Sequence, residues 1–440
     1  MANVLKYAYD GFRNMVAELN TGRDKQSGGS YDLEFFTELD WDTIYRVSWM
    51  GRKIVDIPAE DATRRWREWE GDQQQIEAVE ALEARLMLPN RIQKGMKQAR
   101  CYGGSALYIH IRNSDPTLPL RPEEVGLGDL EYVVNLTKEV LTAGPIERDP
   151  LAQYYGKPKY YEVHSASMGH VSIHPSRLVV FTGNDLLNPE FNAGAWEGWG
   201  DSVLMAAYEA VRNADATANN VASLVYEAKV DVLQIPNLAD VMSDKRTRDL
   251  LVQRVQLAAQ LKGNNGMLVL DTEEEYSNKS YAFAGLTDIN RQALQAVAGA
   301  ADIPVTRFLG QTPSGLSSTG ESDLKNYYDS VASLQALELT PAMRVLDDCL
   351  LRSALGDAAQ DVTYVWASLW QMTDMERAEV TEKVCNSIST LVSTGLFPED
   401  ALSASAQAAL AEHSMFPALD LEAFPIEVDE EEESETLIPE

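Results

Sequence analysis

The stretch that decides the fold is Ser202–Glu227, with the sequence SVLMAAYEAVRNADATANNVASLVYE. Its apolar residues recur at three- and four-residue steps, which predicts a long, Ala-rich amphipathic helix. The same periodicity predicts a second helix over residues 286–301, LTDINRQALQAVAGAA. Short apolar runs and a mixed-charge segment over residues 229–285 separate the two, so we expect a pair of helices with a β-α-β insert between them.

The insert has apolar runs long enough for strands but too short for buried helices. We expect its strands at Val230–Ile235 and Met267–Leu270, a helix at 239–261 and a further short strand at Tyr281–Phe283.

The chain before this helix pair divides into a helical part and a β-rich part. Helical periodicity runs from Trp41 to about Gly104, with one helix ending at Leu88-Pro89 because the residue before a proline disfavours the helical region. Short apolar runs bounded by turn residues follow. These predict strands at 106–111, 130–136, 160–164, 170–173 and 177–181, so the fold class is α+β.

After the helix pair, residues 303–319 (IPVTRFLGQTPSGLSST) predict a loop, because two prolines and two glycines interrupt any regular period. A helix is expected to about Glu338, restarting after Thr340-Pro341 and ending near residue 355. A strand (362–365) and helices at 374–394 and 398–411 follow. The segment from Asp420 has ten acidic residues and no basic one, which is typical of a disordered tail.

Composition narrows the functional classes. The chain has 440 residues and a formal net charge of −31, which argues against a broad phosphate-gripping face or docking on anionic membranes. Cys101, Cys349 and Cys385 form no CxxC motif, and so low a count fits a reducing compartment. No signal peptide and no uncharged apolar stretch of membrane-spanning length is evident, so we expect a soluble protein made in the cytoplasm.

The common catalytic motifs are missing from the sequence. It contains no phosphate-binding loop, dinucleotide-binding fingerprint, nucleophile elbow or HExxH zinc motif. His164, His170 and His174 could share one face of a strand pair, but no cysteine or tight carboxylate cluster near them supports a metal site. Cys101 has no histidine near it in sequence and is expected to be a small buried residue. We therefore expect no catalytic residue, no metal and no cofactor.

Several segments together resemble the portal proteins of tailed bacteriophages, specifically a phage-associated portal family once described only as a domain of unknown function. The resemblance covers residues 41 to about 355 and rests on the order and spacing of five motifs. These are IVDIPAEDATRRW (54–66), ARCYGGSALYI (99–109), HPSRLVVFTG (174–183), WGDSV (199–203) and IPVTRFLGQTPSGLSSTGESDLKNYY (303–328).

The resemblance implies a portal-like α+β architecture with a mixed wing, a two-helix stem, a clip insert and a tunnel loop. It implies the following division: an N-terminal arm and linker (1–30), a wing (31–200), a first stem-region helix (201–228), the clip (229–285), a second stem helix (286–302), the tunnel loop (303–319), a long wing helix (320–355), a helical crown-like part (356–419) and the acidic tail (420–440).

A portal protein is a structural protein of the virion that catalyses no reaction. The resemblance implies a homo-oligomeric ring, of about twelve subunits, at one capsid vertex, made in the host bacterial cytoplasm. Double-stranded DNA would pass through its channel during genome packaging and ejection. The implied partners are the terminase large subunit, head-completion or adaptor proteins at the head-tail connector, and major capsid and scaffold proteins. No membrane partner is expected.

The tunnel loop is where we expect DNA to be met. Its side chains are mostly polar and uncharged, which suits weak contacts with a moving phosphate backbone, and Arg307 is the only charged residue between Ile303 and Thr319. The alternative for Arg307 is an ion pair with an acid such as Asp302 or Glu321. The residues expected to face DNA are Arg307, Gln311, Thr312, Ser314, Gly315, Ser317 and Ser318.

Two other functional classes stay open from the sequence. One is a phage metal-dependent hydrolase that processes nucleotides or DNA with His164, His170, His174 and acidic residues. The other is a minor capsid or adaptor protein that contacts a portal ring without forming it.

Overall fold

The structure is a computed structural model, and it describes residues 36–152, 154–165, 169–187, 198–226, 229–234, 245–261, 275–280, 285–310, 320–370, 374–394 and 406. The contacts divide the chain into two units, Met1–Ala367 and Ser368–Glu440. Each unit is described by itself.

Two small antiparallel sheets form the β-rich part of the first unit. One has the strand order β3 (Leu130–Thr137), β2 (Gly104–Ile111), β7 (Leu178–Thr182), and the other has the order β4 (Leu141–Ala143), β5 (Tyr161–Ser165), β6 (Gly169–Ile173). Side chains from both sheets share one apolar core. Its buried members are Ala106, Tyr108, Leu136, Leu141, Tyr161, Val163, Ile173, Leu178 and Trp199.

Helix α5 (Leu88–Tyr102) covers the face of the first sheet opposite this shared core. Strand β2 is consequently buried almost throughout, because a helix lies on one side of it and a sheet on the other. Gly95 permits this close packing, since a Cβ there would lie 2.7 Å from the Phe181 ring. The Ser105 hydroxyl also donates to the Gly95 carbonyl (2.6 Å).

The helical part of the first unit begins with α2 (Glu38–Val47), α3 (Trp49–Arg64) and α4 (Gln73–Leu86). Pro89 does more than end a helix, since it lies in the first turn of α5, where proline needs no N–H partner. Met87, in the left-handed region (φ 51°), joins α4 to α5. Strands β1 (Arg67–Glu70) and β4 were not expected, because each is too short for an alternating pattern to register.

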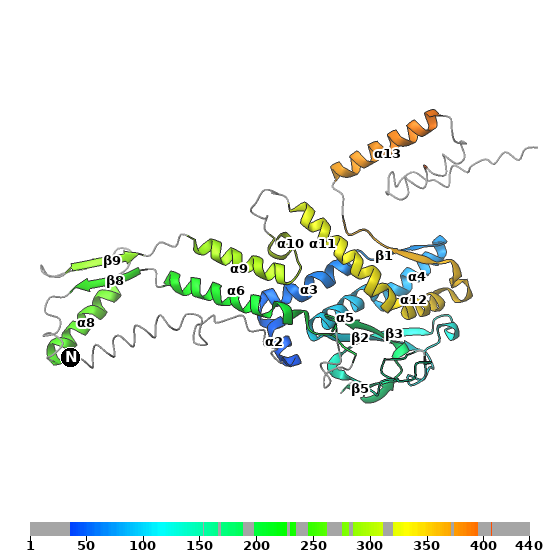
Figure 1. The fold of residues 1–440 in the computed structure, drawn as a ribbon, viewed down its shortest axis with the longest axis horizontal. Coiled ribbons are helices and arrows are strands. Elements are labelled where there is room, and N and C mark those ends of the chain that lie inside the picture. The colour runs from blue at the N-terminus through cyan, green and yellow to red at the C-terminus, as the bar shows by residue number, and fades with distance from the viewer. Residues whose placement is uncertain are drawn as a thin grey trace, which may run out of the picture. The chain divides into compact units, whose positions relative to one another are not determined.

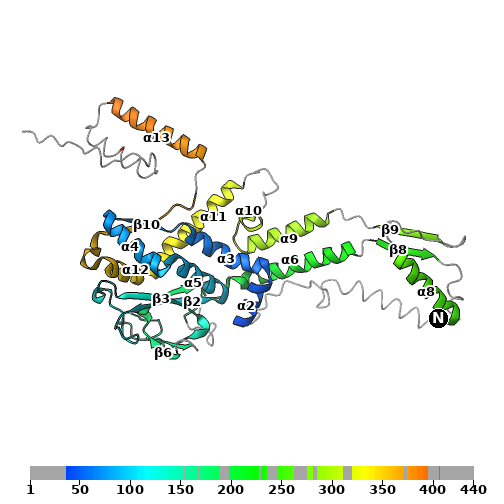
Figure 2. The same cartoon turned by 180° about the vertical axis from the view of Figure 1, so that it is seen from behind.

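The two helices expected around the insert are present as α6 (Val203–Tyr226) and α9 (Leu286–Ala300), and they lie side by side (Figures 1 and 2). Between them in the chain come β8 (Lys229–Gln234), α8 (Lys245–Leu261) and β9 (Glu275–Ser280). β8 and β9 pair antiparallel. The sequence analysis missed β9, because EYSNKS has a single large apolar residue. The strands expected at Met267–Leu270 and Tyr281–Phe283 lie outside the described residues.

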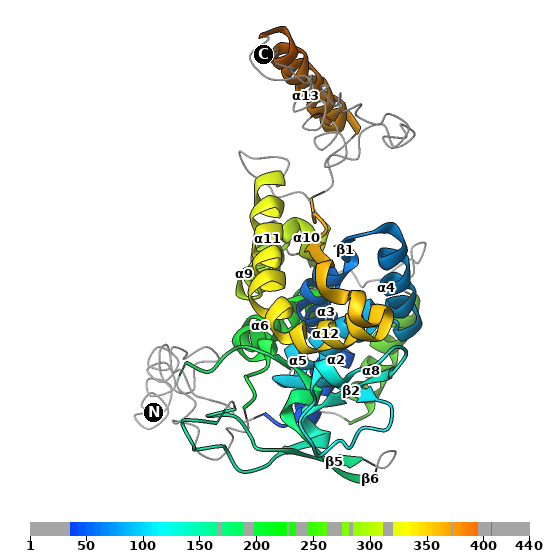
Figure 3. The same ribbon diagram turned by 90° about the vertical axis from the view of Figure 1, so that its right-hand side faces the viewer.

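The long helical segment after the tunnel loop does not break where proline suggested. Helix α11 (Glu321–Leu334) continues through a π-helical turn (Gln335–Leu339) into α12 (Thr340–Leu355), which runs beside α4 (Figure 3). The wider turn accommodates Pro341, which has no N–H to donate. The Thr340 hydroxyl donates to the Gln335 carbonyl (2.9 Å) and so satisfies part of the altered backbone.

The remaining elements of the first unit are short. They are α10 (Val305–Leu309), β10 (Thr363–Trp366) and 3₁₀ turns at Pro122–Glu124, Lys138–Val140, Pro175–Arg177 and Gly356–Asp361. In the second unit α13 (Asp374–Thr394) is present as expected. The helix expected at 398–411, the tail from Asp420 and the arm before residue 36 lie outside the described residues. Together the elements confirm the α+β class.

None of the helices in the described part of the chain combines the length and the apolar composition that a membrane crossing needs.

A buried arginine ties elements from the beginning of the first unit to elements near its end. The Arg67 guanidinium, with no exposed side-chain surface, donates to Glu83 Oε1 through Nε (2.9 Å) and Nη2 (2.7 Å), and to Asp347 Oδ1 through Nη1 (2.6 Å). Its neighbours in β1 and β10 close the site, with the Trp69 and Tyr364 rings each 4.5 Å from the guanidinium carbon. This arrangement joins β1, α4, α12 and β10.

We expect Arg67→Met to lower the free energy of unfolding by about 3–5 kcal/mol, because it leaves two buried carboxylates without their cation. Arg121→Met is the matched control. Arg121 pairs with Glu124 at 3.0 Å on the open surface, where such a pair contributes about 0–1 kcal/mol. Urea unfolding of both variants measures the difference. Equal losses would show that the Arg67 network does not hold these four elements together.

Candidate functional site

Three of the motif segments meet at the beginning of α6. The Gly103 carbonyl, at the end of α5, accepts hydrogen bonds from the backbone N–H groups of both Gly183 and Gly200 (2.9 Å each). Asn184 and Asp201 exchange a pair of backbone hydrogen bonds (2.8 Å each) beside them. We call these contacts the glycine junction. It binds the segment that leads into α6 to the end of α5 and to β7.

The glycines of this junction are required by space and by backbone conformation. Gly103 has φ 88°, in the left-handed region, and a Cβ there would lie 2.2 Å from the Gly200 carbonyl oxygen. A Cβ on Gly183 would lie 2.2 Å from the Asp201 carbonyl oxygen. The beginning of α6 is therefore fixed by backbone contacts that no other residue type allows.

A second junction forms where α3, α10 and α11 meet. Asp61 of α3 has no exposed side-chain surface, and it accepts two hydrogen bonds from the Arg307 guanidinium (3.0 and 3.1 Å). The Tyr327 hydroxyl of α11 donates to the same carboxylate (3.1 Å). Arg64 Nε lies 3.7 Å from the other oxygen. We call Asp61, Arg64, Arg307 and Tyr327 the Asp61 cluster.

The electrostatics of this cluster follow from burial and charge. The hydrogen bond to Asp61 raises the pKa of Arg307, so its guanidinium stays charged. Burial raises the pKa of Tyr327, so the phenol stays protonated and remains a donor. The fork of Arg307 matches both oxygens of the carboxylate, which is the geometry of a strong charge-assisted pair. The cluster thus attaches both ends of the tunnel loop to α3.

The tunnel loop begins as a helix and not as the irregular segment that we expected. Its first residues form α10, which Gly310 ends in the left-handed region (φ 67°). Before α10, α9 closes with a Schellman-type turn, in which Ile303 N–H donates to Ala298 O and Asp302 has φ 53°. The Lys53 ammonium of α3 donates to the Phe308 carbonyl (2.5 Å) and so holds the last turn of α10.

An open groove lies beside the Asp61 cluster, between the beginnings of α6 and α11 and the end of α9. Its volume is about 660 Å³, and residues of α3, α5, α6, α9 and α11 line it. The Arg100 side chain on its wall donates to the carbonyls of Ile54 (3.0 Å) and Val55 (3.2 Å). Pro58 has no N–H for the Ile54 carbonyl, so Arg100 supplies the missing donor inside α3. Burial lowers the pKa of Arg100 to about 10.

Of the expected DNA-facing residues, only Arg307 is described. Its partner is Asp61, and not Asp302 or Glu321, the two acids that the sequence analysis named as examples. Gln311, Thr312, Ser314, Gly315, Ser317 and Ser318 lie outside the described residues. Contact of these seven residues with DNA stays a prediction.

Sequence reasoning missed the roles of Asp61 and Tyr327, although both belong to the motifs that it quoted. A signal was present, because Asp61 stands seven residues after Ile54 and so falls on the apolar stripe of α3. An acidic residue on a buried stripe needs a partner. The sequence could therefore have predicted that Asp61 is paired, but not which residue pairs with it.

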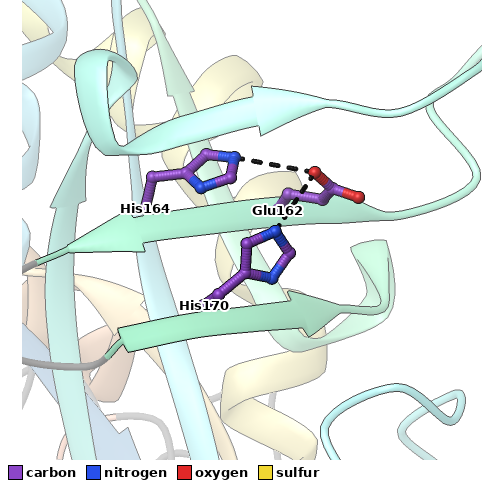
Figure 4. A group of neighbouring side chains, drawn as sticks. All are labelled: Glu162, His164 and His170. Atoms are coloured by element: carbon purple, nitrogen blue, oxygen red, sulfur yellow. Dashed lines mark ion pairs between the residues drawn. The ribbon is translucent and has the colours of Figure 1, made fainter.

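The structure separates the three histidines considered as metal ligands. His164 and His170 lie opposite each other on β5 and β6, and Glu162 joins them on the same face (Figure 4). His174 lies elsewhere, where its Nδ1 accepts from the Ser176 N–H (3.2 Å). Cys101 is buried as expected, and burial raises the pKa of its thiol to about 12, which makes it an unreactive side chain.

The chain is similar to curated bacterial proteins along most of its length. It is 36% identical over 426 residues to a protein of Caulobacter sp. (strain RHG1) and 35% identical over 429 residues to one of Sphingomonas paeninsulae, both named anti-CBASS protein Acb1. The matches cover 93% and 96% of this chain and 68% of each relative. A protein of Haemophilus influenzae is 28% identical over 395 residues, covering 89% of this chain and 88% of that protein.

Solved structures of phage-like particles are also similar. A chain from the virion of a native gene transfer agent particle has a TM-score of 0.48 at 10% identity, covering 87% of this chain and 96% of that chain. An HK97-family phage portal protein from Corynebacterium diphtheriae has a TM-score of 0.37 at 13% identity, covering 76% and 95%.

The family described as phage portal protein matches residues 40–390, which include the glycine junction, the Asp61 cluster, the helix pair α6 and α9, and most of α13. This is most of the chain, and it takes in every motif that suggested the resemblance. The chain therefore belongs to the phage portal protein family.

Proposed function

We propose that this chain is the ring-forming portal subunit at one vertex of a phage capsid. The channel of the ring admits DNA during packaging and releases it during ejection, and the tunnel loop is the part of each subunit that meets the duplex. The observation that carries this proposal is the Asp61 cluster, because one buried carboxylate secures the segments on both sides of that loop.

A loop that faces a moving polymer must keep its base in place while its tip yields. Arg307, in the helical first part of the loop, and Tyr327, after the loop, bind the same carboxylate, and the Lys53 ammonium holds the carbonyl of Phe308 beside them. Lateral force on the loop would therefore pass into α3 and the wing. We infer that this anchoring lets the loop contact DNA repeatedly without unfolding its own base.

The helix pair supports assembly from several subunits. α6 buries Leu204, Ala207, Val211 and Ala214 near its beginning, whereas its later residues up to Leu224 are exposed or half-buried. Leu224 and, on α9, Ile289 are 46% and 55% exposed. Small side chains allow close helix packing, and a ring is built from head-to-tail contacts between unlike faces. Neighbouring subunits would cover these faces.

The negative charge of the chain favours a protein that lets DNA pass rather than one that binds it tightly. Each contact between a cation and a phosphate releases counterions and adds affinity, so many such contacts would hold the duplex still. A formal net charge of −31 leaves few cations for such contacts. Solubility alone also explains an acidic protein.

The remaining contacts of the subunit follow from the same proposal. The clip, residues 229–285, would dock the terminase large subunit and later the head-completion or adaptor proteins, because it forms the insert between the two stem helices. Major capsid and scaffold proteins would surround the wing. The ATP-driven motor belongs to terminase, and the portal subunit itself catalyses no step.

The names of two relatives point to a second candidate role, an anti-CBASS activity. About a third of each relative has no counterpart in this chain, so the activity in their names can reside in the unmatched part. The test uses a phage whose portal function is supplied by an unrelated portal protein, prepared with and without the gene for this chain. The plating of the two phages is compared on hosts with and without CBASS. A plating advantage confined to CBASS hosts would support it.

The purified chain should assemble into a closed ring. Twelve subunits of 48.7 kDa give a particle of about 0.6 MDa, measurable by light scattering and visible as an annulus in negative stain. Scaffold protein should be added where the chain alone stays small. A chain that remains monomeric or dimeric with scaffold present would favour an adaptor or minor capsid role.

Acidic residues introduced into the tunnel loop should impair DNA packaging without preventing ring assembly, because they would repel phosphates at the narrowest contact. We suggest the double substitution Thr312→Asp and Ser314→Asp. The matched control adds the same charge in the acidic tail, through Ser434→Asp and Thr436→Asp. The amount of packaged DNA per capsid measures the effect. Equal packaging by both variants would show that the loop does not contact DNA in the channel.

Arg307 offers a way to separate anchoring from DNA contact. Arg307→Ala should lower the free energy of unfolding by about 2–3 kcal/mol, because Asp61 is left as a buried and poorly satisfied charge. Arg307→Lys keeps the positive charge but loses the bidentate fit to the carboxylate. Its free energy of unfolding should therefore lie between those of the wild type and Arg307→Ala. If Arg307 acts on DNA through its charge, Lys should also restore packaging. Wild-type stability in both variants would contradict the anchoring role.

A further inference from the structure

The β5–β6 hairpin carries three potential metal ligands on one face. Glu162 and His164 stand two residues apart on β5, so their side chains point the same way, and His170 is the cross-strand partner of His164. Figure 4 shows both imidazole rings and the carboxylate directed toward one another. The connection at residues 166–168 lies outside the described residues.

The distances within this group fit a small transition-metal ion. Glu162 Oε2 lies 3.6 Å from His164 Nε2 and 3.7 Å from His170 Nε2, and the ligand atoms all lie within 4.8 Å of one another. Zinc bonds to nitrogen and oxygen at about 2.0–2.2 Å, so two ligands of a tetrahedral site stand about 3.3–3.6 Å apart. The two distances from Glu162 already match that separation, and rotation of the exposed imidazole rings would bring the two histidine nitrogens into the same geometry.

We propose that Glu162, His164 and His170 bind a zinc-type divalent cation, with water completing the coordination. Two imidazoles and one carboxylate form a ligand set that zinc accepts, whereas magnesium and calcium prefer oxygen ligands alone. The site goes beyond the portal function and does not depend on it. It also departs from our expectation of no metal, because the sequence analysis considered His174 and overlooked Glu162.

The position of the site indicates a structural role for the ion. All three side chains are at the protein surface, with 35% to 63% of their side-chain area exposed. The groove of about 660 Å³ is lined by other residues, so no substrate pocket that we describe adjoins the ligands. The ion would join β5 to β6 on the exposed face of the second sheet and so add a link to the backbone pairing and the core packing that hold these strands.

The competing explanation is that the histidines pair with Glu162 only as protonated cations. The test uses the full chain, treated with EDTA, exchanged into buffer and titrated with Zn²⁺, with Mg²⁺ as the hard-cation comparison. We expect one Zn²⁺ per chain by calorimetry and elemental analysis, no Mg²⁺ at the same concentration, and a higher melting temperature with Zn²⁺.

The double variant His164→Gln and His170→Gln should bind Zn²⁺ at least 10–100-fold more weakly, the range seen even for loss of a supporting residue around a metal. His110→Gln is the matched control, because His110 stacks on Tyr132 (4.2 Å between ring centres) and has one carboxylate, Glu131, at 3.4 Å. That control should bind as the wild type does.

A measurement on the wild type guards against misfolding of the double variant. Zn²⁺ should protect His164 and His170 from diethyl pyrocarbonate, read by peptide mass spectrometry, and leave His110 unprotected. Absence of Zn²⁺ uptake by the wild type, equal uptake by the double variant, or protection at other histidines only would each overturn the proposal.

Discussion

The buried carboxylate of Asp61 is the constraint on which the base of the tunnel loop depends. A charge inside a protein is costly unless it is paired and hydrogen-bonded, so α3 can pack only where donors reach this group. Those donors come from Arg307 and Tyr327, which lie 246 and 266 residues further along the chain. Apolar packing is non-directional and would tolerate several placements of α10 and α11, whereas a carboxylate with two fixed partners accepts one.

The position at which α6 begins is also fixed, but by close backbone packing and not by a buried charge. At the glycine junction, backbone groups of Gly103, Gly183 and Gly200 approach so closely that side chains are excluded. The two long helices therefore start or end at fixed places, α6 at the glycine junction and α9 beside the Asp61 cluster. In the ring that we propose, this division would have a clear use, because the parts proposed to face DNA and neighbouring subunits could vary while the segments that support them stay fixed.

Much of the fold followed from periodicity, and the failures have identifiable physical causes. α6, α9 and β2 were predicted because each carries an apolar pattern over many residues. α10 was missed because five residues are too few for a pattern, although Pro304 and Gly310 mark its two ends. The π turn before Pro341 was missed because proline can be absorbed by a wider turn as well as by a break. The Asp61 cluster was beyond sequence reasoning, since its partners are set by tertiary packing and not by spacing.

The use of cations inside the wing bears on how an acidic ring could treat DNA. Arg67 and Arg177 are almost fully buried, and Arg100 and Arg307 are engaged with backbone carbonyls and with Asp61. Each of these guanidinium groups is directed to groups of the same chain, so it contributes little to the field outside. Asp61, Glu83 and Asp347 are buried with these arginines, so most of the buried positive charge is offset, and the rest of the chain carries a net negative charge close to the formal value of −31. If the chain forms the ring that we propose, a duplex inside it would be repelled from all sides and held near the axis, where it could slide because no strong contact would arrest it.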